Sequence, residues 1–201
     1  MNLALLKQKL LSIDYNGYMQ SLSDNVTSAG NQQERLLHID AHLGHYLAGF
    51  ADGEGSFNVS VVKRQSDYQT GWKIVASFNI SQREATVPLL FQEVLQCGTI
   101  RYRKDGVCYF EVRTISDINE TVRAFFACFP LRSMRQAYRL QLLLQITQLL
   151  QERSHLTPDG LQEVLELRQL MISNRKRKYE LTDVLQNPQR LIRQTSSHFV
   201  G

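Results

Sequence analysis

The sequence contains no apolar run long enough to cross a membrane. A transmembrane helix needs about 20 consecutive apolar residues, and polar or charged residues interrupt every hydrophobic stretch of this 201-residue chain. The first residues also lack the positive charge followed by an apolar segment that marks a secretory signal. We therefore expect no membrane segment and no export.

Cysteine is scarce as well. The three cysteines are Cys97, Cys108 and Cys128, and no two of them form a CxxC pair. This spacing supports neither a zinc site nor a disulfide framework. Buried, reduced thiols are the usual alternative, and they suit a reducing compartment. With 201 residues, of which 43% are hydrophobic, the chain is long enough for one domain with a sizeable core.

Excess charge is absent from most of the chain. Residues 172–201 hold six basic and two acidic residues and thus the whole net charge of +4, so residues 1–171 balance at zero. Basic groups gathered in one place favour a polyanionic partner, although a solvated basic tail would have the same composition. The densest group is Arg175, Lys176, Arg177 and Lys178.

One stretch, residues 47–55 (LAGFADGEG), combines helical periodicity with glycines. Gly49 and Gly53 lie four residues apart, on one face of the predicted helix, and each costs roughly 1 kcal/mol relative to alanine. An ordinary amphipathic helix with a glycine C-cap is the simple alternative. The absence of both Cβ atoms instead predicts close approach of a second backbone. An apolar stripe at helical spacing surrounds them, formed by Leu43, Tyr46, Leu47 and Phe50.

The same predicted helix ends in two carboxylates. Asp52 and Glu54 precede Gly55, a suitable helix stop. Two such helices packed side by side would bring carboxylates from both helices together at their ends. Oxygen ligands of this kind are what a divalent cation such as Mg²⁺ prefers.

The remainder of the chain predicts an α+β fold. Alternation of apolar and polar residues predicts strands at 57–64, 72–81, 99–104 and 107–113, and Asp105-Gly106 predicts a hairpin between the last two. Apolar residues at helical spacing predict helices at 84–96, 116–127, 133–153 and 157–173. Shorter helices are expected near 182–185 and 188–194.

These helices can cover only one face of a four-stranded antiparallel sheet. The other face meets solvent or a ligand, and a plain solvated face is the simple alternative. A curved sheet with arginine and asparagine on it can instead enter a DNA major groove, where arginine suits guanine and asparagine suits adenine. Alternation places these side chains on that face: Asn58, Ser60, Val62, Arg64, Lys73, Val75, Ser77, Asn79, Arg101, Arg103, Tyr109, Glu111 and Arg113.

The stretch LAGFADGEG resembles the LAGLIDADG motif of homing endonucleases, with five of nine positions identical, namely Leu47, Ala48, Gly49, Asp52 and Gly55. Ser56-Phe57 and the strand-rich segment behind it also look like that family. The resemblance covers about residues 43–179. It implies the αββαββα fold, an antiparallel four-stranded saddle-shaped sheet with helices on one face. The implied organisation is a helical extension (1–40), an endonuclease domain (41–180) and a basic tail (181–201).

The resemblance implies a site-specific DNA endonuclease. Such an enzyme would cleave both strands of a long pseudo-palindromic duplex to initiate intron homing, by Mg²⁺-dependent phosphodiester hydrolysis that leaves short 3′ overhangs. We expect Mn²⁺ to substitute and Ca²⁺ to support binding without cleavage. The chain is similar to enzymes encoded by group I introns in organellar or bacterial ribosomal RNA genes, which suggests a chloroplast, another organelle or the bacterial cytoplasm. An RNA-binding intron maturase and a non-catalytic DNA-binding protein on the same scaffold are the alternatives.

Site residues follow from the resemblance by position. Glu54 matches the metal-binding acid, and the Gly53 carbonyl is a further candidate ligand. Asp52 matches the acid that serves the helix end and the subunit interface. Gln82 matches the residue that holds the attacking water.

Basic residues are harder to assign. The family lysine that faces the scissile phosphate is missing, so Arg132 or Arg135 must replace it, and Arg135 is preferred. An arginine that commonly follows the water-holding residue is also in doubt, because Thr86 stands nearer its slot than Arg83 does. The basic group at Arg175 to Lys178 is expected on DNA phosphates.

Only one copy of the motif is present, and residues 114–201 contain no second one. One chain then supplies half a saddle and one metal-binding acid. Two acids and a symmetric saddle require a homodimer with two-fold symmetry, which would read a pseudo-palindromic duplex. The expected interface consists of Tyr46, Gly49, Phe50, Asp52 and Gly53.

Overall fold

The computed structural model describes residues 38–63, 72–171, 178–179 and 181–185. These ranges contain most of the predicted domain at 41–180. Residues 1–37 of the predicted helical extension (1–40) and most of the predicted basic tail lie outside the described residues. Arg64, Arg175, Lys176 and Arg177 lie outside them as well.

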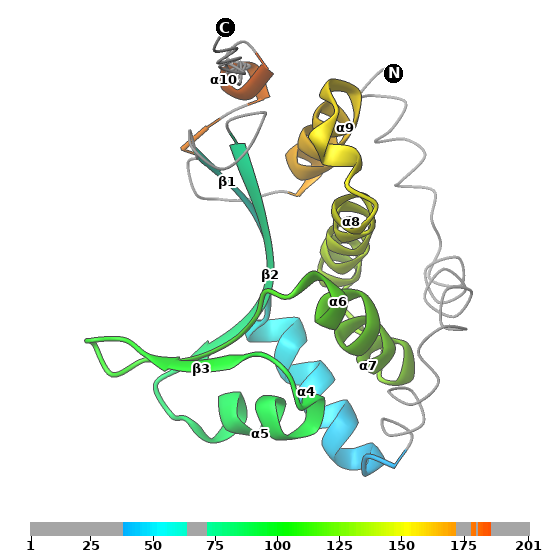
Figure 1. The fold of residues 1–201 in the computed structure, drawn as a ribbon. Coiled ribbons are helices and arrows are strands. Elements are labelled where there is room, and N and C mark those ends of the chain that lie inside the picture. The colour runs from blue at the N-terminus through cyan, green and yellow to red at the C-terminus, as the bar shows by residue number, and fades with distance from the viewer. Residues whose placement is uncertain (1–37, 64–71, 172–177, 180, 186–201) are drawn as a thin grey trace, which may run out of the picture.

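Four antiparallel strands form one sheet in the order β1-β2-β4-β3, which confirms the predicted α+β architecture. The strands are β1 (Ser56–Lys63), β2 (Trp72–Gln82), β3 (Thr99–Tyr102) and β4 (Cys108–Val112). Figure 1 shows that the long β1–β2 pair bends away from the plane of β3 and β4, so the sheet is curved.

The hairpin between β3 and β4 lies at the predicted place, but its loop has three residues, Lys104 to Gly106, because the N–H of Arg103 donates to the carbonyl of Val107 at 2.9 Å. Arg101 pairs with Tyr109, and Thr99 pairs with Glu111. Gly106 has a φ of +81°, a conformation in which a residue with a Cβ atom is strained. Its N–H donates to the carbonyl of Arg103 at 3.0 Å. This register puts Arg101, Tyr109 and Glu111 on one face of the sheet.

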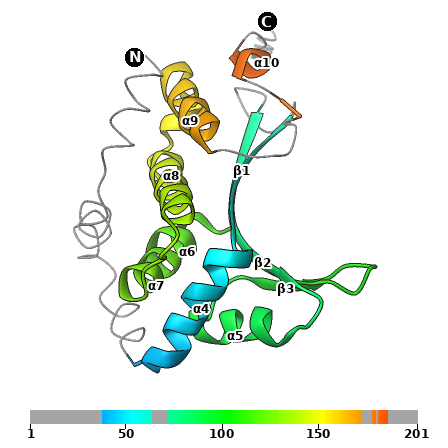
Figure 2. The same cartoon turned by 180° about the vertical axis from the view of Figure 1, so that it is seen from behind.

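Helices cover the opposite face of the sheet (Figures 1 and 2). Side-chain caps begin three of them: Asp40 accepts from the N–H of Leu43, Ser133 from that of Gln136, and Thr157 from that of Gly160. In chain order the helices are α4 (Ala41–Glu54), α5 (Thr86–Leu95), α6 (Ile115–Asp117), α7 (Arg123–Cys128), α8 (Met134–Gln151), α9 (Pro158–Leu170) and α10 (Leu181–Leu185), with a 3-10 turn at Ser154–Leu156.

The helix predicted at 116–127 contains a wider segment. Between α6 and α7 the chain winds as a π-helix over Ile118–Val122. Asn119 in this segment donates to Oε1 of Gln151 and accepts from the hydroxyl of Thr147, each at 2.5 Å. These bonds tie the π segment to α8. A polar contact between distant segments leaves no trace in hydrophobic periodicity, so the sequence pattern predicts a plain helix here.

The core between sheet and helices is built on phenylalanine. Phe78 of β2 is fully buried, and its ring lies between 5.1 and 6.3 Å from four others, measured between centroids. Such rings add edge-to-face and offset contacts to the burial of their surface. The four partners of Phe78 are Phe57, Phe91, Phe110 and Phe126.

Two arginines cover the outer edge of the sheet at β1. Arg139 of α8 donates to the carbonyl of Phe57 at 3.2 Å, and Arg168 of α9 donates to the carbonyl of Val59 at 3.1 Å. Because β1 is an edge strand, alternate carbonyls along it have no partner within the sheet. Arg168 also donates to the carbonyl of Tyr179 at 3.1 Å, so it joins the segment before α10 to the sheet.

We expect Phe78→Ala to lower the free energy of unfolding by about 3–5 kcal/mol, because it removes a ring from the centre of the core and leaves a cavity. Denaturant unfolding followed by circular dichroism measures the change. Tyr102→Ala is the matched control: this aromatic is 64% exposed, and its loss should cost less than about 0.5 kcal/mol. Equal effects of the two substitutions would contradict the described core.

Candidate active site and nucleic-acid interface

The C-terminal tip of α4 presents an exposed carboxylate. Glu54 is the last residue of this helix, and both Glu54 and Gly53 are exposed. The C-terminal end of a helix carries partial negative charge from its last carbonyl groups. Carboxylate and helix end therefore act together, and both favour a cation beside this tip.

Asp52, two residues earlier, joins α4 to α8. Its carboxylate accepts hydrogen bonds from the backbone N–H of Arg132 at 2.7 Å and from that of Ser133 at 3.2 Å. Ser133 is the N-cap of α8, so the negative charge lies at the positive end of that helix. The two acids of the motif thus differ: Asp52 is half-buried and bonded to the backbone, whereas Glu54 is exposed.

Gln136 makes a second link between the same two helices. Its side-chain amide donates to the carbonyl of Gly55 at 2.8 Å, and it lies 3.4 Å from the carbonyls of Ala51 and Asp52. The residue is 8% exposed. Carbonyls at the end of a helix lack partners within the helix, so this amide satisfies the end of α4 at the point where the chain turns into β1.

The fold brings Gln82 to the same end of the sheet as Glu54. Gln82 is the last residue of β2 and is half-buried. Ser56 pairs with Asn79 in the antiparallel β1–β2 ladder. Residues just before Ser56 and residues just after Asn79 therefore lie at one end of this strand pair. Glu54 and Gln82 belong to these two segments.

The two candidate arginines flank the start of α8. Arg132 lies in the turn before this helix, where the backbone bond to Asp52 holds it near the α4 tip. Arg135 is in the first turn of α8, and both side chains are exposed. Burial, and then the charge of Arg135, lower the pKa of Arg139. Because the N–H of Arg132 donates to Asp52, Arg132 is the candidate that the backbone ties directly to the acidic motif, although the motif position favours Arg135.

No other described residue covers the glycine face of α4. A Cβ atom added at Gly49 or at Gly53 would meet no atom within 4 Å. Tyr46 on the same helix is 52% exposed, and Phe50 is half-buried. By contrast, Leu47, Ala48 and Ala51 face the core and are buried. The two glycines therefore serve no packing contact among residues 38–63, 72–171, 178–179 and 181–185.

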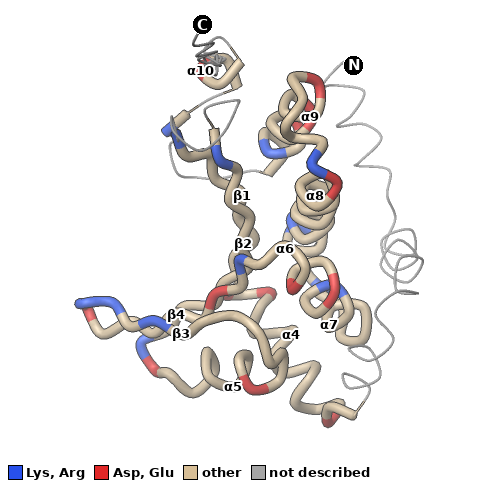
Figure 3. Tube along the Cα trace, viewed as in Figure 1, with Lys and Arg blue, Asp and Glu red and all other residues tan. Residues whose placement is uncertain are grey.

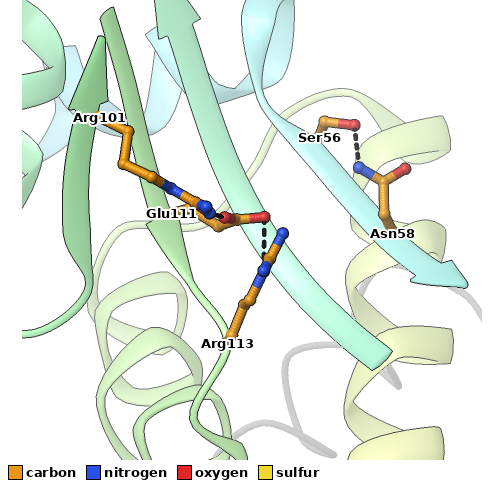
Figure 4. Close-up of polar contacts among 5 residues, drawn as sticks. All are labelled: Ser56, Asn58, Arg101, Glu111 and Arg113. Atoms are coloured by element: carbon orange, nitrogen blue, oxygen red, sulfur yellow. Dashed lines mark hydrogen bonds and ion pairs between the residues drawn. The ribbon is translucent and has the colours of Figure 1, made fainter. Parts of the chain in front are cut away.

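The sheet face opposite the helices carries the polar side chains that alternation predicts. Asn58 donates to the hydroxyl of Ser56 at 2.8 Å on this face of β1 (Figure 4). Figure 3 shows basic residues along the β3–β4 hairpin and at the far ends of β1 and β2. The described members of the predicted set share the face or adjoin its strands: Asn58, Ser60, Val62, Lys73, Val75, Ser77, Asn79, Arg101, Arg103, Tyr109, Glu111 and Arg113.

Several of these groups are paired with one another. The guanidinium of Arg103 donates to the hydroxyl of Tyr109 at 3.0 Å and lies 2.9 Å from the carboxylate of Asp105. The hydrogen bond to Tyr109, followed by the charge of Asp105, raises the pKa of Arg103. Lys178, the described member of the predicted basic group, is exposed and lies 5.5 Å from the ring of Tyr179.

Among the described residues, no three His, Cys, Asp or Glu side chains gather in a group that could bind a metal. Glu54 is a hard oxygen donor, and Mg²⁺ keeps several waters and needs only one or two protein carboxylates. Glu54 at the α4 tip fits such an ion as one ligand. No described helix is long and apolar enough to span a bilayer.

Residues 47–138, from within α4 to the first turns of α8, match the family described as LAGLIDADG endonuclease. This segment belongs to the LAGLIDADG family. The match contains the α4 tip, all four strands and the start of α8. It confirms the family and the fold that the motif predicts.

Relatives of this LAGLIDADG chain are named as endonucleases. It is 32% identical over 127 residues to "probable intron-encoded endonuclease 2" of Neurospora crassa, covering 61% of this chain and 28% of that protein. It is 29% identical over 100 residues to the DNA endonuclease I-CvuI of Chlorella vulgaris, covering 49% of this chain and 62% of that protein. The chain thus spans less than two thirds of either relative.

Solved structures of I-CvuI share the fold. One contains a DNA target in the presence of 2 mM Mg, with the DNA not cleaved; it has a TM-score of 0.63 and 26% identity, over 73% of this chain and 94% of that one. A second contains the target in the presence of 2 mM Ca, with a TM-score of 0.62 and 26% identity, over the same shares of the two chains. These relatives are therefore seen with DNA and with divalent cations.

Three residues near the site were not predicted from the sequence. Gln136, Arg139 and Arg168 hold the end of α4 and the edge of β1 through backbone carbonyls. Their one sequence signal is a polar residue at a position where helical periodicity calls for an apolar one. Gln136 and Arg168 are both buried, and such buried polar groups are expected to have partners.

The two acids of the motif should differ in their effect on stability. We expect Asp52→Ala to lower the free energy of unfolding by about 1–3 kcal/mol, because two backbone N–H groups lose a charged acceptor. Glu54→Ala, which removes an exposed carboxylate from the same helix, should change it by less than about 0.5 kcal/mol. Denaturant unfolding of both variants checks this, and a larger loss for Glu54→Ala would reverse the assignment.

Proposed function

We propose that this chain is a site-specific DNA endonuclease that works as a homodimer and cleaves both strands of a pseudo-palindromic duplex. One observation carries the proposal: Glu54 is exposed at the end of α4, the helix whose glycine face is uncovered. The relatives named as endonucleases, and the structures of I-CvuI with DNA, support it.

Dimerisation follows from the shape of α4. Two copies of this helix can approach closely where Gly49 and Gly53 leave space. The contact would cover Tyr46 and Phe50, the exposed and half-buried aromatic residues beside the glycines. A two-fold axis through this contact would place both Glu54 tips together and join two curved sheets into one longer surface.

Divalent cations complete the chemistry. Glu54 from each copy, assisted by the Gly53 carbonyl, would hold Mg²⁺, which when bound supplies an activated water and neutralises charge at the scissile phosphate. The chain's own groups would act around it. Gln82 would orient the attacking water, and Arg132 or Arg135 would hold the phosphate. The polar sheet face would keep the duplex in register.

We expect Glu54→Gln to lower the cleavage rate by roughly 100-fold or more, because a lost metal ligand removes several kcal/mol of charge stabilisation. DNA affinity measured in Ca²⁺ should stay within about threefold, since shape and the sheet face are kept. The assay uses targets selected by the wild-type protein from a randomised duplex library in Mg²⁺. Glu120→Gln, at an exposed acid of the π segment, has the same charge change and should cleave normally.

Two results would overturn this assignment. If Glu54→Gln cleaves at the wild-type rate, Glu54 is not the metal ligand. If the wild-type protein binds a selected duplex but cuts none in Mg²⁺ or Mn²⁺, the chain is a DNA-binding protein on this scaffold rather than a nuclease.

We expect Gly49→Leu to separate the dimer without unfolding the chain. The added side chain points into open space in the single subunit, and leucine favours a helix over glycine by roughly 1 kcal/mol. Analytical ultracentrifugation should show monomers. Thermal unfolding of these monomers should still show a cooperative transition. Gln145→Leu, on an exposed position of α8, should remain dimeric. A stable dimer of Gly49→Leu would exclude the α4 pair as the interface.

A further inference from the structure

A single carboxylate lies within the polar face of the sheet. Glu111 is the one acidic residue in the four described strands. It is on β4, between Asn79 of β2 and Thr99 of β3, and its side chain is only 10% exposed. A buried negative charge in the middle of a face that would meet DNA phosphates calls for an explanation.

Two arginines occupy the carboxylate of Glu111. Arg101 reaches one of its oxygens diagonally across the β3–β4 pair, and the Nε of Arg113 lies 2.9 Å from the other (Figure 4). Arg113 is two residues further along the chain, so it projects to the same side. The side chains of Arg101 and Arg113 remain 54% and 56% exposed. The acid is thus covered by two cations that themselves still face outward.

The pairing fixes the directions of both guanidinium groups. An unpaired arginine has rotamer entropy to lose when it binds, and a side chain already held in place loses less. A mobile cation on this face would settle on phosphates, which attract every basic group whatever the sequence. A guanidinium held in one direction favours a base edge that matches its planar fork.

The negative charge of Glu111 also favours sequence specificity. Two arginines and one carboxylate leave a net charge of +1 at this point of the sheet, so the general attraction to DNA is weaker than two arginines alone would give. Specificity is the difference between affinities for correct and incorrect targets. Weaker non-specific binding together with aimed side chains increases that difference.

We propose that Glu111 is a positioning residue that sets base specificity: it holds Arg101 and Arg113 so that they contact base edges instead of phosphates. This role rests on the proposed binding of DNA to the sheet. Direct contact between Glu111 and a cytosine amino group is disfavoured, because both carboxylate oxygens already have arginine partners.

The test compares base preference and salt dependence of binding in Ca²⁺, without any cleavage. The wild-type protein first selects its target from a randomised duplex library, and each variant is then profiled on all single-base changes of that target. Glu111→Asp keeps the charge but shortens the reach, whereas Glu111→Gln keeps the reach but removes the charge. Thermal unfolding confirms that each variant is folded.

We expect Glu111→Asp to lower the preference at the base pairs read by Arg101 and Arg113 by roughly tenfold, with the salt dependence unchanged. Glu111→Gln should lose the same preference and show a steeper salt slope, by about 0.9 in log Kd against log salt for each new phosphate contact. Glu163→Gln is the matched control, because it makes the same charge change at an exposed acid of α9, a helix on the other face of the sheet. Its base preference should not change.

A variant in which lysine replaces both arginines lacks the planar guanidinium groups. It therefore separates an effect of Glu111 through these arginines from a direct contact between Glu111 and a base. In Arg101→Lys/Arg113→Lys, Glu111→Asp should have no further effect on base preference. An undiminished effect in that background would make Glu111 a direct reader and overturn the proposal, as would a wild-type preference profile in Glu111→Asp. If the wild-type protein selects no sequence at all, the proposed function itself fails, and the role of Glu111 fails with it.

Discussion

The contact between the end of α4 and the start of α8 determines where the candidate site lies. Asp52 accepts from two backbone N–H groups at the beginning of α8, and Gln136 donates back to carbonyls at the end of α4. The Asp52 carboxylate thus meets the partial positive charge at the start of α8, and the Gln136 amide meets the partial negative charge at the end of α4. Because β1 begins two residues after Glu54, the same bonds set the direction of the exposed acid and the first strand of the sheet together.

The sheet face shows how a polar surface can be ordered before a ligand arrives. Its arginines are not independent charges: Arg103 is held by Tyr109 and Asp105, and Arg101 shares Glu111 with Arg113. Exposed ion pairs contribute little to stability, so this pattern is better understood as control of direction. The buried Glu111 carboxylate differs from the exposed Asp105 carboxylate in being enclosed by its partners.

Much of this architecture could be predicted from local patterns. Alternation predicted which side chains share the sheet face, and Asp105-Gly106 predicted the place of the hairpin, because both depend on residues close in sequence. The contacts of Gln136 and the π-helical turn at Asn119 could not be predicted, since each joins segments far apart in the chain. The choice between Arg132 and Arg135 is similar: only the backbone bond to Asp52 distinguishes the two.

The coverage of β1 by arginines has a consequence for assembly. An edge strand normally offers a row of unpaired backbone groups to which another chain can add a strand. Here the carbonyls of Phe57 and Val59 already accept from Arg139 and Arg168. The opposite edge strand, β3, has only 4 residues. Within the described sheet, lateral addition of a strand is therefore hindered at these two carbonyls of β1 and limited by the short length of β3, and both features oppose strand-mediated aggregation.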